Sequence, residues 1–401
     1  MTRPCSLDPR AKSDAGFTVI EVLIAAAIMM TVTGAIFGMM NPSQGLFQTQ
    51  PEVSDMQQRL RVGVDTLQKD LIMAGAGTYT GASAGALSFF VAPILPYRAI
   101  GDNTDPSRGV FFRDDAITLI YVPPTPAQTT ISLPMPAQSS EIKVTDQANC
   151  PKGTELCGFE IGMRLIIFDP DGNWDTFTVT QVQDAAAHLQ HRGQDFTVSY
   201  AAGSRVTQVK TATYYLREDD ATQTYQLMYY DGWDTELPVV DNVVGLKFEY
   251  FGEAQPPELT GKPLTAAYGP WTTYGPKPVP LTETRTGWPA GENCAFAVQN
   301  GQHVPRLPDL SDNVSQVPIT EQMLSDGPWC PDAAKPNRFD ADLLRVRRVR
   351  VTLRVQAGLE RLRGMDALRF AKPGTATQSA RMVPDQEISF DVTPRNMNLG
   401  R

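Results

Sequence analysis

The chain has 401 residues, with 35 basic and 44 acidic side chains and a formal net charge of −9. This length allows one large domain or two small ones behind any targeting segment. The acidic balance disfavours nucleic acid as a direct ligand, because no basic surplus is available to neutralise phosphates.

The first sixteen residues form a short polar leader with three basic and two acidic side chains. The leader lacks the apolar core of an ordinary secretory signal peptide. Basic residues on this side of an apolar segment favour a cytoplasmic N-terminus. The rest of the chain is therefore predicted to cross the membrane outward.

The segment from Phe17 to Met40 is apolar except for one carboxylate, Glu21. A helix of this length spans roughly 36 Å, which is enough to cross a bilayer. An ionised carboxylate in hydrocarbon costs at least several kcal/mol, so such a residue is a functional candidate. A plain membrane anchor would explain the apolar residues but not this acid.

A second, amphipathic helical stretch is predicted for residues 41–75. Pro42 should end or kink the first helix, because proline cannot donate a backbone hydrogen bond. The predicted apolar stripe recurs at three- and four-residue steps: Val53, Met56, Leu60, Val64, Leu67 and Leu71. This stripe should pack on a globular domain, and Gly75 and Gly77 should stop the helix.

Residues 76–251 change to short β-branched or aromatic runs separated by turn residues, which predicts an antiparallel head domain. The predicted strands are residues 116–122, 141–144, 164–168, 175–182, 212–216, 226–230 and 243–251. The expected fold class is α+β, with a long N-terminal helix packed on an antiparallel β-sheet.

Residues 252–340 differ in composition, because they hold 14 of the 32 prolines and three of the five tryptophans. They are too rich in proline for the interior of a sheet and too aromatic for a flexible linker. We predict an ordered, disulfide-stapled insertion on the surface. Residues 341–401 should then return to the head domain, with strands at 349–355 and 387–392 and a C-terminal tail.

Residues 16–25, Gly-Phe-Thr-Val-Ile-Glu-Val-Leu-Ile-Ala, resemble the type III signal of the type IV pilin and pseudopilin family. The resemblance implies that a prepilin peptidase cuts between Gly16 and Phe17 and that Phe17 is then N-methylated. It also implies a role for Glu21 in assembly. A buried carboxylate needs a cation, which the terminal ammonium of Phe17 or of a neighbouring subunit can supply.

The head domain extends the resemblance in four segments, residues 213–216, 227–230, 238–250 and 346–353, which are similar to PilW-type minor pilins. The resemblance implies a minor pilin that helps prime assembly of a type IV pilus and sits at or near its tip. One alternative is a J-type minor pseudopilin of a type II secretion system. Another is a pilus-displayed adhesin or DNA-uptake module that uses residues 252–340.

The implied partners are other minor and major pilins in a hetero-oligomeric filament tip, the prepilin peptidase and an inner-membrane assembly platform. The expected location is the bacterial inner membrane, as a single-pass protein with a cytoplasmic N-terminus, and then the pilus, cell surface or periplasm. No direct nucleic-acid contact is expected. There is no G-x-x-x-x-G-K-[ST] phosphate loop, and we expect neither enzymatic activity nor a catalytic cofactor.

Removal of the leader would remove Cys5 and leave four cysteines in the exported part, where disulfides persist. We expect the pairs Cys150–Cys157 and Cys294–Cys330 because these neighbours are nearest in sequence, although three connectivities are possible. A zinc site is the rival interpretation, but the spacings match no zinc pattern.

Four oxygen-bearing side chains alternate along one short segment: Asp169, Asp171, Asn173 and Asp175. Calcium loops use such alternation, with glycine at the sixth position and glutamate at the twelfth. Here glycine falls at the fourth position and threonine at the twelfth. A hairpin connection needs the same residue types. We expect the hairpin, with calcium as the alternative.

Two further groups have weaker metal-binding or ligand-binding signals. His188 and His191 lack a third ligand nearby and are expected in a solvated connection. A basic run is expected on an exposed strand face or a partner-facing edge: Arg345, Arg347, Arg348, Arg350 and Arg354.

Overall fold

The structure is a computed structural model in which most of the chain after residue 15 is described. The described residues are 16–77 (backbone only for 40–48), 91–96, 104–105, 110–111, 115–148, 150–169, 173–193, 195–219, 224–256, 278–284, 287–320, 322–331, 338–359, 362–363, 383–394 and 397. Residues 1–15 of the predicted leader, which spans residues 1–16, therefore lie outside the described residues.

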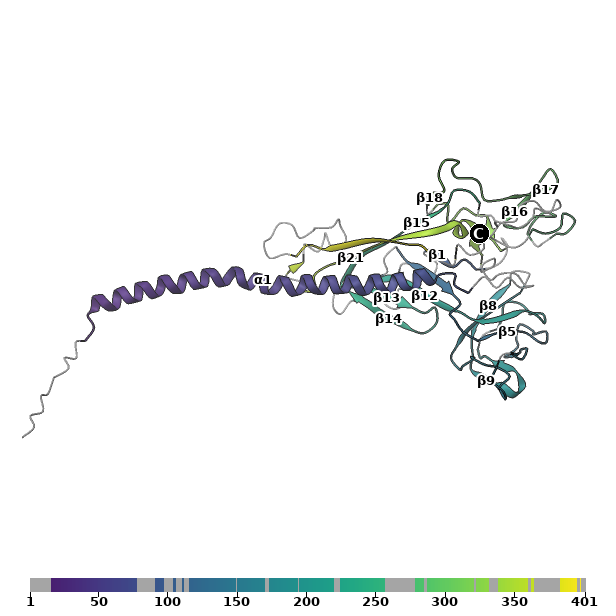
Figure 1. Ribbon diagram of the computed structural model, residues 1–401, viewed down its shortest axis with the longest axis horizontal. Helices are drawn as coiled ribbons and strands as arrows, with labels where there is room; N and C mark the ends of the chain where they lie inside the picture. The colour runs from purple at the N-terminus through teal and green to yellow at the C-terminus, as the bar shows by residue number, and fades with distance from the viewer. Residues whose placement is uncertain are drawn as a thin grey trace, which may run out of the picture.

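One long helix, α1 (Val19–Met73), carries both the membrane segment and the amphipathic segment (Figure 1). It continues through Pro42 without a break, and Figure 1 shows a shallow change of direction about midway. After Met73 the backbone turns through Gly75 and Gly77, which both have positive φ angles. A Cβ atom on Gly77 would lie 2.8 Å from the Cβ atom of Val122, so this turn also requires glycine for space.

Five antiparallel strands form the first sheet, in the order β1-β4-β12-β13-β14. Their bounds are β1 (Ile94–Pro96), β4 (Ile117–Tyr121), β12 (Lys210–Asp219), β13 (Thr224–Tyr230) and β14 (Glu236–Asp241). A separate two-stranded ribbon is formed by β2 (Thr104–Asp105) and β3 (Val110–Phe111).

Four antiparallel strands form the second sheet, in the order β18-β15-β21-β22. Their bounds are β18 (Gln316–Ile319), β15 (Val243–Glu253), β21 (Val346–Val355) and β22 (Gln386–Val392). Strand β18 comes from residues 252–340, so part of the predicted surface insertion adds an edge strand to this sheet. Its Pro318 is tolerated because β18 is an edge strand, where one side of the backbone needs no partner.

Helix α1 and the two sheets share one hydrophobic core, and together they are called the scaffold. The second half of the helix buries four members of the predicted stripe: Met56, Leu60, Leu67 and Leu71. Gly63 lets the helix approach the second sheet closely, since a Cβ atom there would lie 2.5 Å from the Cδ2 atom of Leu353. Each fully buried aliphatic side chain contributes about 1.5–3 kcal/mol, so this stripe holds the helix to the sheets.

Residues 123–208 form a second β-structure with its own core, which we call the distal barrel. One of its sheets has the order β5-β11-β7-β8 and the other has the order β6-β10-β9. A bridge between Ile131 and Val144 joins the ends of β5 and β6 and closes the structure. Its elements are β5 (Gln128–Thr130), β6 (Glu141–Lys143), β7 (Arg164–Phe168), β8 (Trp174–Thr178), β9 (Gln181–Gln183), η2 (Asp184–Ala186), β10 (His188–Gln190) and β11 (Arg205–Gln208).

The single strand predicted for residues 175–182 is wrong, because this segment is divided between β8 and β9. The amide of Val179 donates to the Met163 carbonyl, whereas the next amide, Thr180, donates to the Gln190 carbonyl. The chain thus leaves one sheet and enters the other at this point. The alternation of β-branched residues in the sequence does not show that the strand changes its pairing partner at this point.

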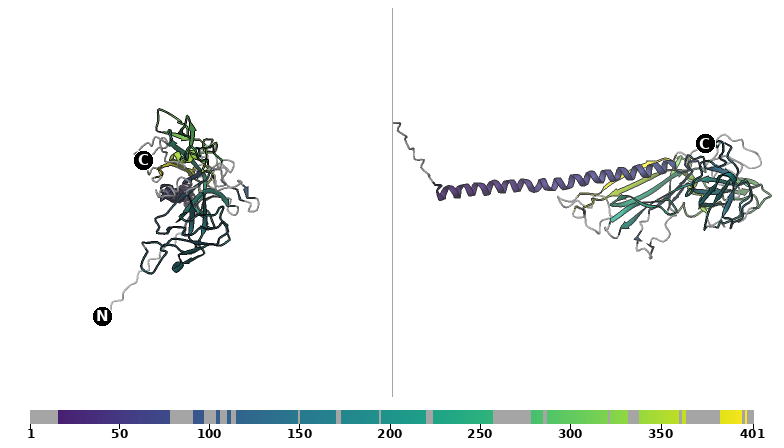
Figure 2. Two further views of the ribbon diagram at one scale, coloured as in Figure 1. Left: turned by 90° about the vertical axis from the view of Figure 1, so that its right-hand side faces the viewer. Right: turned by 90° about the horizontal axis from the view of Figure 1, so that it is seen from below.

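The remaining described part, residues 278–345, forms what we call the disulfide lobe. It contains β16 (Phe296–Gln299), β17 (Gln302–Pro305), β19 (Trp329–Cys330), β20 (Phe339–Asp340) and the 3₁₀ turn η3 (Ala341–Arg345), together with the scaffold strand β18. Figure 2 shows both the disulfide lobe and the distal barrel at the end of the molecule farthest from the start of α1.

Three of the five residues in the basic run are buried and so do not lie on an exposed face as predicted: Arg345, Arg347 and Arg354. Arg348 and Arg350 are partly exposed and pair with Asp391. The Arg345 guanidinium donates to the carbonyls of Ala254 at 3.1 Å and Pro308 at 2.5 Å. Its Nε atom lies 2.7 Å from the Asp342 carboxylate. Arginine can be buried here because backbone carbonyls and a carboxylate replace the lost water.

Candidate assembly site at the N-terminal helix

Helix α1 begins with a reciprocal capping arrangement between Thr18 and Glu21. The Thr18 hydroxyl accepts from the Glu21 amide at 3.4 Å, and the Glu21 carboxylate accepts from the Thr18 amide at 2.8 Å. The Thr18 hydroxyl also donates to this carboxylate at 2.9 Å. The pattern Thr-x-x-Glu is a capping box and was readable from the sequence, but the sequence reasoning considered only the charge of Glu21.

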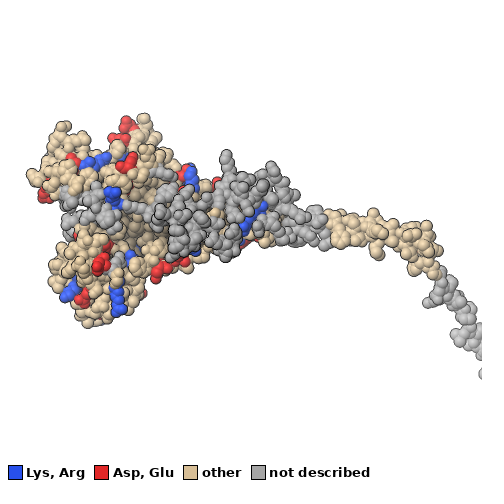
Figure 3. Space-filling view, turned by 180° about the vertical axis from the view of Figure 1, so that it is seen from behind, with Lys and Arg blue, Asp and Glu red and all other residues tan. Residues whose placement is uncertain are grey.

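The helix beyond this cap has the length and composition of a membrane span over Val19–Met39, and none of this span is buried. Figure 3 shows no charged atoms on the visible face of the tan segment that projects from the head. Phe17, directly before the cap, is 87% exposed. An apolar surface of this extent is stable only when lipid or another protein covers it.

Small residues give the exposed span a shallow apolar hollow. It is lined by Ala26, Met29, Met30, Thr33, Gly34 and Phe37. A Cβ atom on Gly34 or Gly38 would meet nothing within 4 Å, so another helix could approach closely there. The Thr31 hydroxyl donates to the Ala27 carbonyl and needs no water partner.

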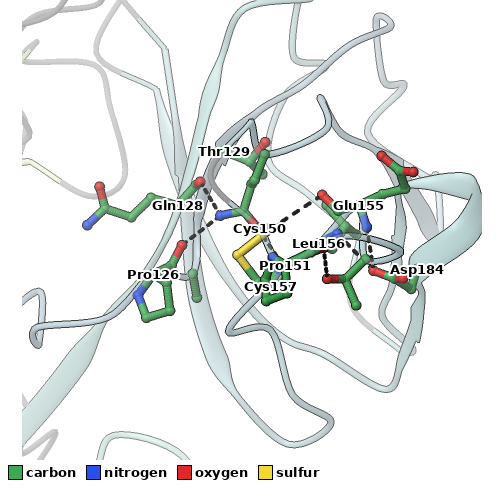
Figure 4. Close-up of a disulfide and its surroundings, with 12 residues drawn as sticks. Pro126, Gln128, Thr129, Cys150, Pro151, Glu155, Leu156, Cys157 and Asp184 are labelled. Carbon is green, nitrogen blue, oxygen red and sulfur yellow. Dashed lines mark hydrogen bonds between the residues drawn. A yellow bond between two sulfur atoms is a disulfide. The ribbon is translucent and has the colours of Figure 1, made fainter.

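Both disulfides favoured by sequence proximity are present in the structure. Cys150 and Cys157 close a short loop in the distal barrel, and Cys294 and Cys330 join two segments of the disulfide lobe. In Figure 4 the first loop is fixed by Asp184, whose carboxylate accepts from two backbone amides of the loop. These cysteines therefore crosslink the head, away from the N-terminal helix.

Asp169 and Asn173 flank the connection between β7 and β8, which pair as an antiparallel hairpin, and Asp175 lies within β8. The Asp169 carboxylate accepts from the Asn173 amide at 2.9 Å and from its side-chain nitrogen at 2.7 Å. Asp175 accepts from the Tyr200 hydroxyl at 2.8 Å. Asp171 lies outside the described residues. The hairpin is confirmed, and calcium at this connection stays a prediction.

A cluster of acids that the sequence reasoning missed lies in the disulfide lobe. Asp326, Asp340 and Asp342 each place one carboxylate oxygen within 4.8 Å of the others. Asp340 accepts from the Gly327 amide at 2.6 Å, and Asp342 pairs with Arg345. Burial raises the pKa of Asp342 to about 7, while Arg345 opposes this shift. Protein donors thus account for two of the three carboxylates.

The histidines do not form a metal site among the described residues. His188 lies 2.8 Å from the Glu141 carboxylate. His191 is only 3% exposed, so its predicted place in a solvated connection is wrong; the rings of Phe177 and Phe196 pack against it. His303 is also buried, and its Nε2 atom lies 2.9 Å from the Val279 and Gly291 carbonyl oxygens.

Residues 81–85, Gly-Ala-Ser-Ala-Gly, have the spacing of a G-x-S-x-G nucleophile elbow and were overlooked in the sequence reasoning. Such an elbow requires a sharp turn from a strand into a helix, with acid and histidine partners nearby. These residues lie outside the described part of the chain. The expected absence of enzymatic activity therefore stays a prediction.

Comparison with known families gives one match, a prokaryotic N-terminal methylation motif over residues 11–37. Comparison with curated proteins and with solved structures finds no match. The motif covers the end of the leader, the capping box and most of the exposed span. Chains with this motif are generally structural, are processed by prepilin peptidase and assemble with other pilins. The chain thus carries this motif on an exposed apolar helix, a combination that fits a type IV pilin-like prepilin-peptidase substrate with an inner-membrane anchor.

Proposed function

We propose that this protein is a PilW-like minor pilin that helps prime assembly of a type IV pilus and sits at or near its tip. The observation that carries the proposal is the capped Glu21 at the start of a wholly exposed apolar span. A surface of this kind needs a covering, and assembly with other pilins would provide it.

Cleavage between Gly16 and Phe17 would create a terminal amine one residue before the amide that Glu21 already binds. In the uncut chain the Thr18 amide lies 2.8 Å from the Glu21 carboxylate. An N-methylated amine on Phe17 keeps its positive charge, so Glu21 could pair with its own terminus or with that of a neighbouring subunit. Either pairing would offset the cost of placing the carboxylate in hydrocarbon.

The same processed helix would serve a J-type minor pseudopilin of a type II secretion system. Deleting the gene separates the two roles, because a pilus-priming subunit affects pilus number whereas a pseudopilin affects secretion. Loss of secretion with unchanged pilus number would contradict the proposed pilus role.

The cleavage proposal is tested by mass spectrometry of the native N-terminus. We expect a mature chain that begins at a methylated Phe17. An intact Met1, or an unmethylated terminus at another residue, would contradict it.

The pairing role is tested by the Glu21→Ala and Thr18→Val variants. Glu21→Ala should still insert in the membrane but should be strongly depleted from sheared filaments, because it loses the carboxylate. Thr18→Val is the matched control, since it removes the hydroxyl of the cap and keeps the carboxylate. Normal incorporation of Glu21→Ala would refute the role of this residue, and equal depletion of both variants would assign the defect to the helix cap.

A further inference from the structure

The distal barrel is inserted at the end of a β-hairpin of the scaffold. Strands β4 and β12 pair directly, and the last pair in their register is Tyr121 with Lys210. The chain leaves the scaffold at Val122 and returns to it at Val209. A tight turn at this place would connect the two strands without the intervening residues.

The distal barrel buries its own hydrophobic core. Leu165, Phe177 and Leu189 are fully buried within it, and their cluster contains only residues from 127 to 206. Its disulfide closes a loop that is bonded to residues of the same barrel (Figure 4). Core, sheet closure and crosslink are therefore all provided within the inserted segment.

The contact between the distal barrel and the scaffold is made by one outer face of the barrel. Ile166 and Phe168 pack with Ile120 and Val122 in a small apolar cluster. In addition, the Arg164 guanidinium lies over the Trp233 ring, 4.4 Å from its centre. This face docks the barrel without contributing to the core beneath helix α1.

The disulfide lobe is connected to the scaffold in a different way. Its strand β18 hydrogen-bonds to β15, and Leu310 and Val317 pack against the scaffold core. Arg345 donates to the carbonyls of Ala254 and Pro308 and so joins the lobe to the end of β15. Removing residues 252–340 would therefore remove part of the scaffold itself.

We propose that residues 123–208 are a separately folding module that the pilin scaffold displays, and that folding and filament incorporation do not need it. The part of this inference that concerns incorporation rests on the proposed function. The module has five basic and nine acidic side chains, so its charge of −4 disfavours a polyanion such as DNA as its target. The charge of this segment therefore argues against a role in DNA uptake.

Hydrogen exchange on the intact chain in detergent tests whether the two parts unfold separately. Leu165→Ala opens a cavity in the barrel, and Leu353→Ala opens one in the scaffold; both leucines are fully buried. We expect Leu165→Ala to speed exchange at least about tenfold in peptides from residues 123–208 and to leave β13, β15 and β21 unchanged. Leu353→Ala should give the opposite pattern. Equal acceleration in both parts by either variant would overturn the inference.

Replacement of residues 123–208 by Asn-Gly tests whether the scaffold needs the module. A companion variant adds Ile120→Thr, because the deletion exposes this side chain. We expect both shortened chains to be processed like the parent, and at least the companion to enter sheared filaments at the parent's level. If the parent chain enters filaments but the shortened companion variant, although folded and processed, does not, the module inference fails. If the parent itself is absent from filaments, the proposed function fails, and the exchange experiment still decides whether the module folds separately.

Discussion

Asp70 in the scaffold and His191 in the distal barrel are both buried titratable side chains, but their surroundings differ. Asp70 on helix α1 accepts hydrogen bonds from the hydroxyls of Tyr214 at 2.6 Å and Tyr121 at 3.1 Å. His191 in the barrel lies among aromatic rings, and only the Ser139 backbone approaches its imidazole as a hydrogen-bond partner among the described residues. The comparison indicates that polar contacts position the scaffold elements, whereas apolar packing dominates around His191.

The consequence for stability differs between the two groups. A satisfied buried carboxylate joins three elements and fixes the helix in register on the first sheet. Burial disfavours the charged form of an imidazole and so lowers the pKa of His191 below its ordinary value. The stability of the scaffold should therefore depend most on the hydrogen-bond partners of Asp70. The stability of the barrel around His191 should depend most on pH.

The largest effect is expected from Arg345→Met, at the junction of the scaffold and the disulfide lobe. The change leaves Asp342 buried without its cation and several carbonyls without a donor. Loss of one partner of a buried ion pair costs about 3–5 kcal/mol, which chemical denaturation of the full chain in detergent would measure. Arg350→Met is the control, because its pair with Asp391 is exposed to solvent. Equal effects of the two variants would show that burial of Arg345 has no energetic importance.

A smaller loss is expected from Asp70→Asn, which keeps the size of the side chain but removes its charge. The two tyrosine hydroxyls would then donate to a neutral acceptor in place of a carboxylate, so their hydrogen bonds should weaken. The free energy of unfolding should fall by about 1–3 kcal/mol. Exchange should increase in α1, β4 and β12 and not in the distal barrel. Tyr214→Phe and Tyr121→Phe remove the two donors singly. If none of the three variants changes exchange, the proposed positioning role of Asp70 is wrong.

The smallest effect at neutral pH is expected from His191→Leu, whose influence should appear on acidification. The unfolded chain takes up a proton near pH 6.5, whereas the buried imidazole does so only at lower pH. Barrel stability should therefore be fully present above about pH 6.5 and fall as the pH drops towards the lowered pKa. A hydrogen bond with the Ser139 backbone and the charge of Asp195 oppose this lowering of the pKa.

Exchange of barrel peptides between pH 7.5 and pH 5, corrected for the intrinsic pH dependence of exchange, checks this prediction. The parent chain should lose protection in residues 123–208 on acidification, and His191→Leu should lose less. The scaffold peptides of the same samples serve as the internal control. An identical loss of protection in the parent chain and in His191→Leu would show that His191 is not the cause.

Helix α1 and most strands were predictable because their patterns are local. The three- and four-residue spacing of Met56, Leu60 and Leu67 reports a buried helix face directly, and these residues are buried. Strand β7 has the predicted bounds, and β21 and β22 include the predicted segments at 349–355 and 387–392.

The errors came from features that depend on distant residues. Arg345 was predicted to be exposed as a member of a run of arginines, and His191 as part of a solvated connection. Their burial depends on Ala254, Pro308 and the aromatic rings of the barrel, which local patterns do not place nearby. Proline content likewise indicated a surface insertion outside the sheets for residues 252–340, although an edge strand such as β18 tolerates proline.

The amino-acid sequence by itself determined the N-terminal motif, the apolar span with its single acid, and the cysteine neighbours that form the disulfides. These features depend on residues close together in the chain, where composition and spacing carry the physical signal. Only the tertiary structure decided that residues 123–208 close on a core of their own, while the disulfide lobe shares the scaffold. That division depends on strand pairing between Tyr121 and Lys210 and on which side chains bury one another, and both join residues far apart in sequence.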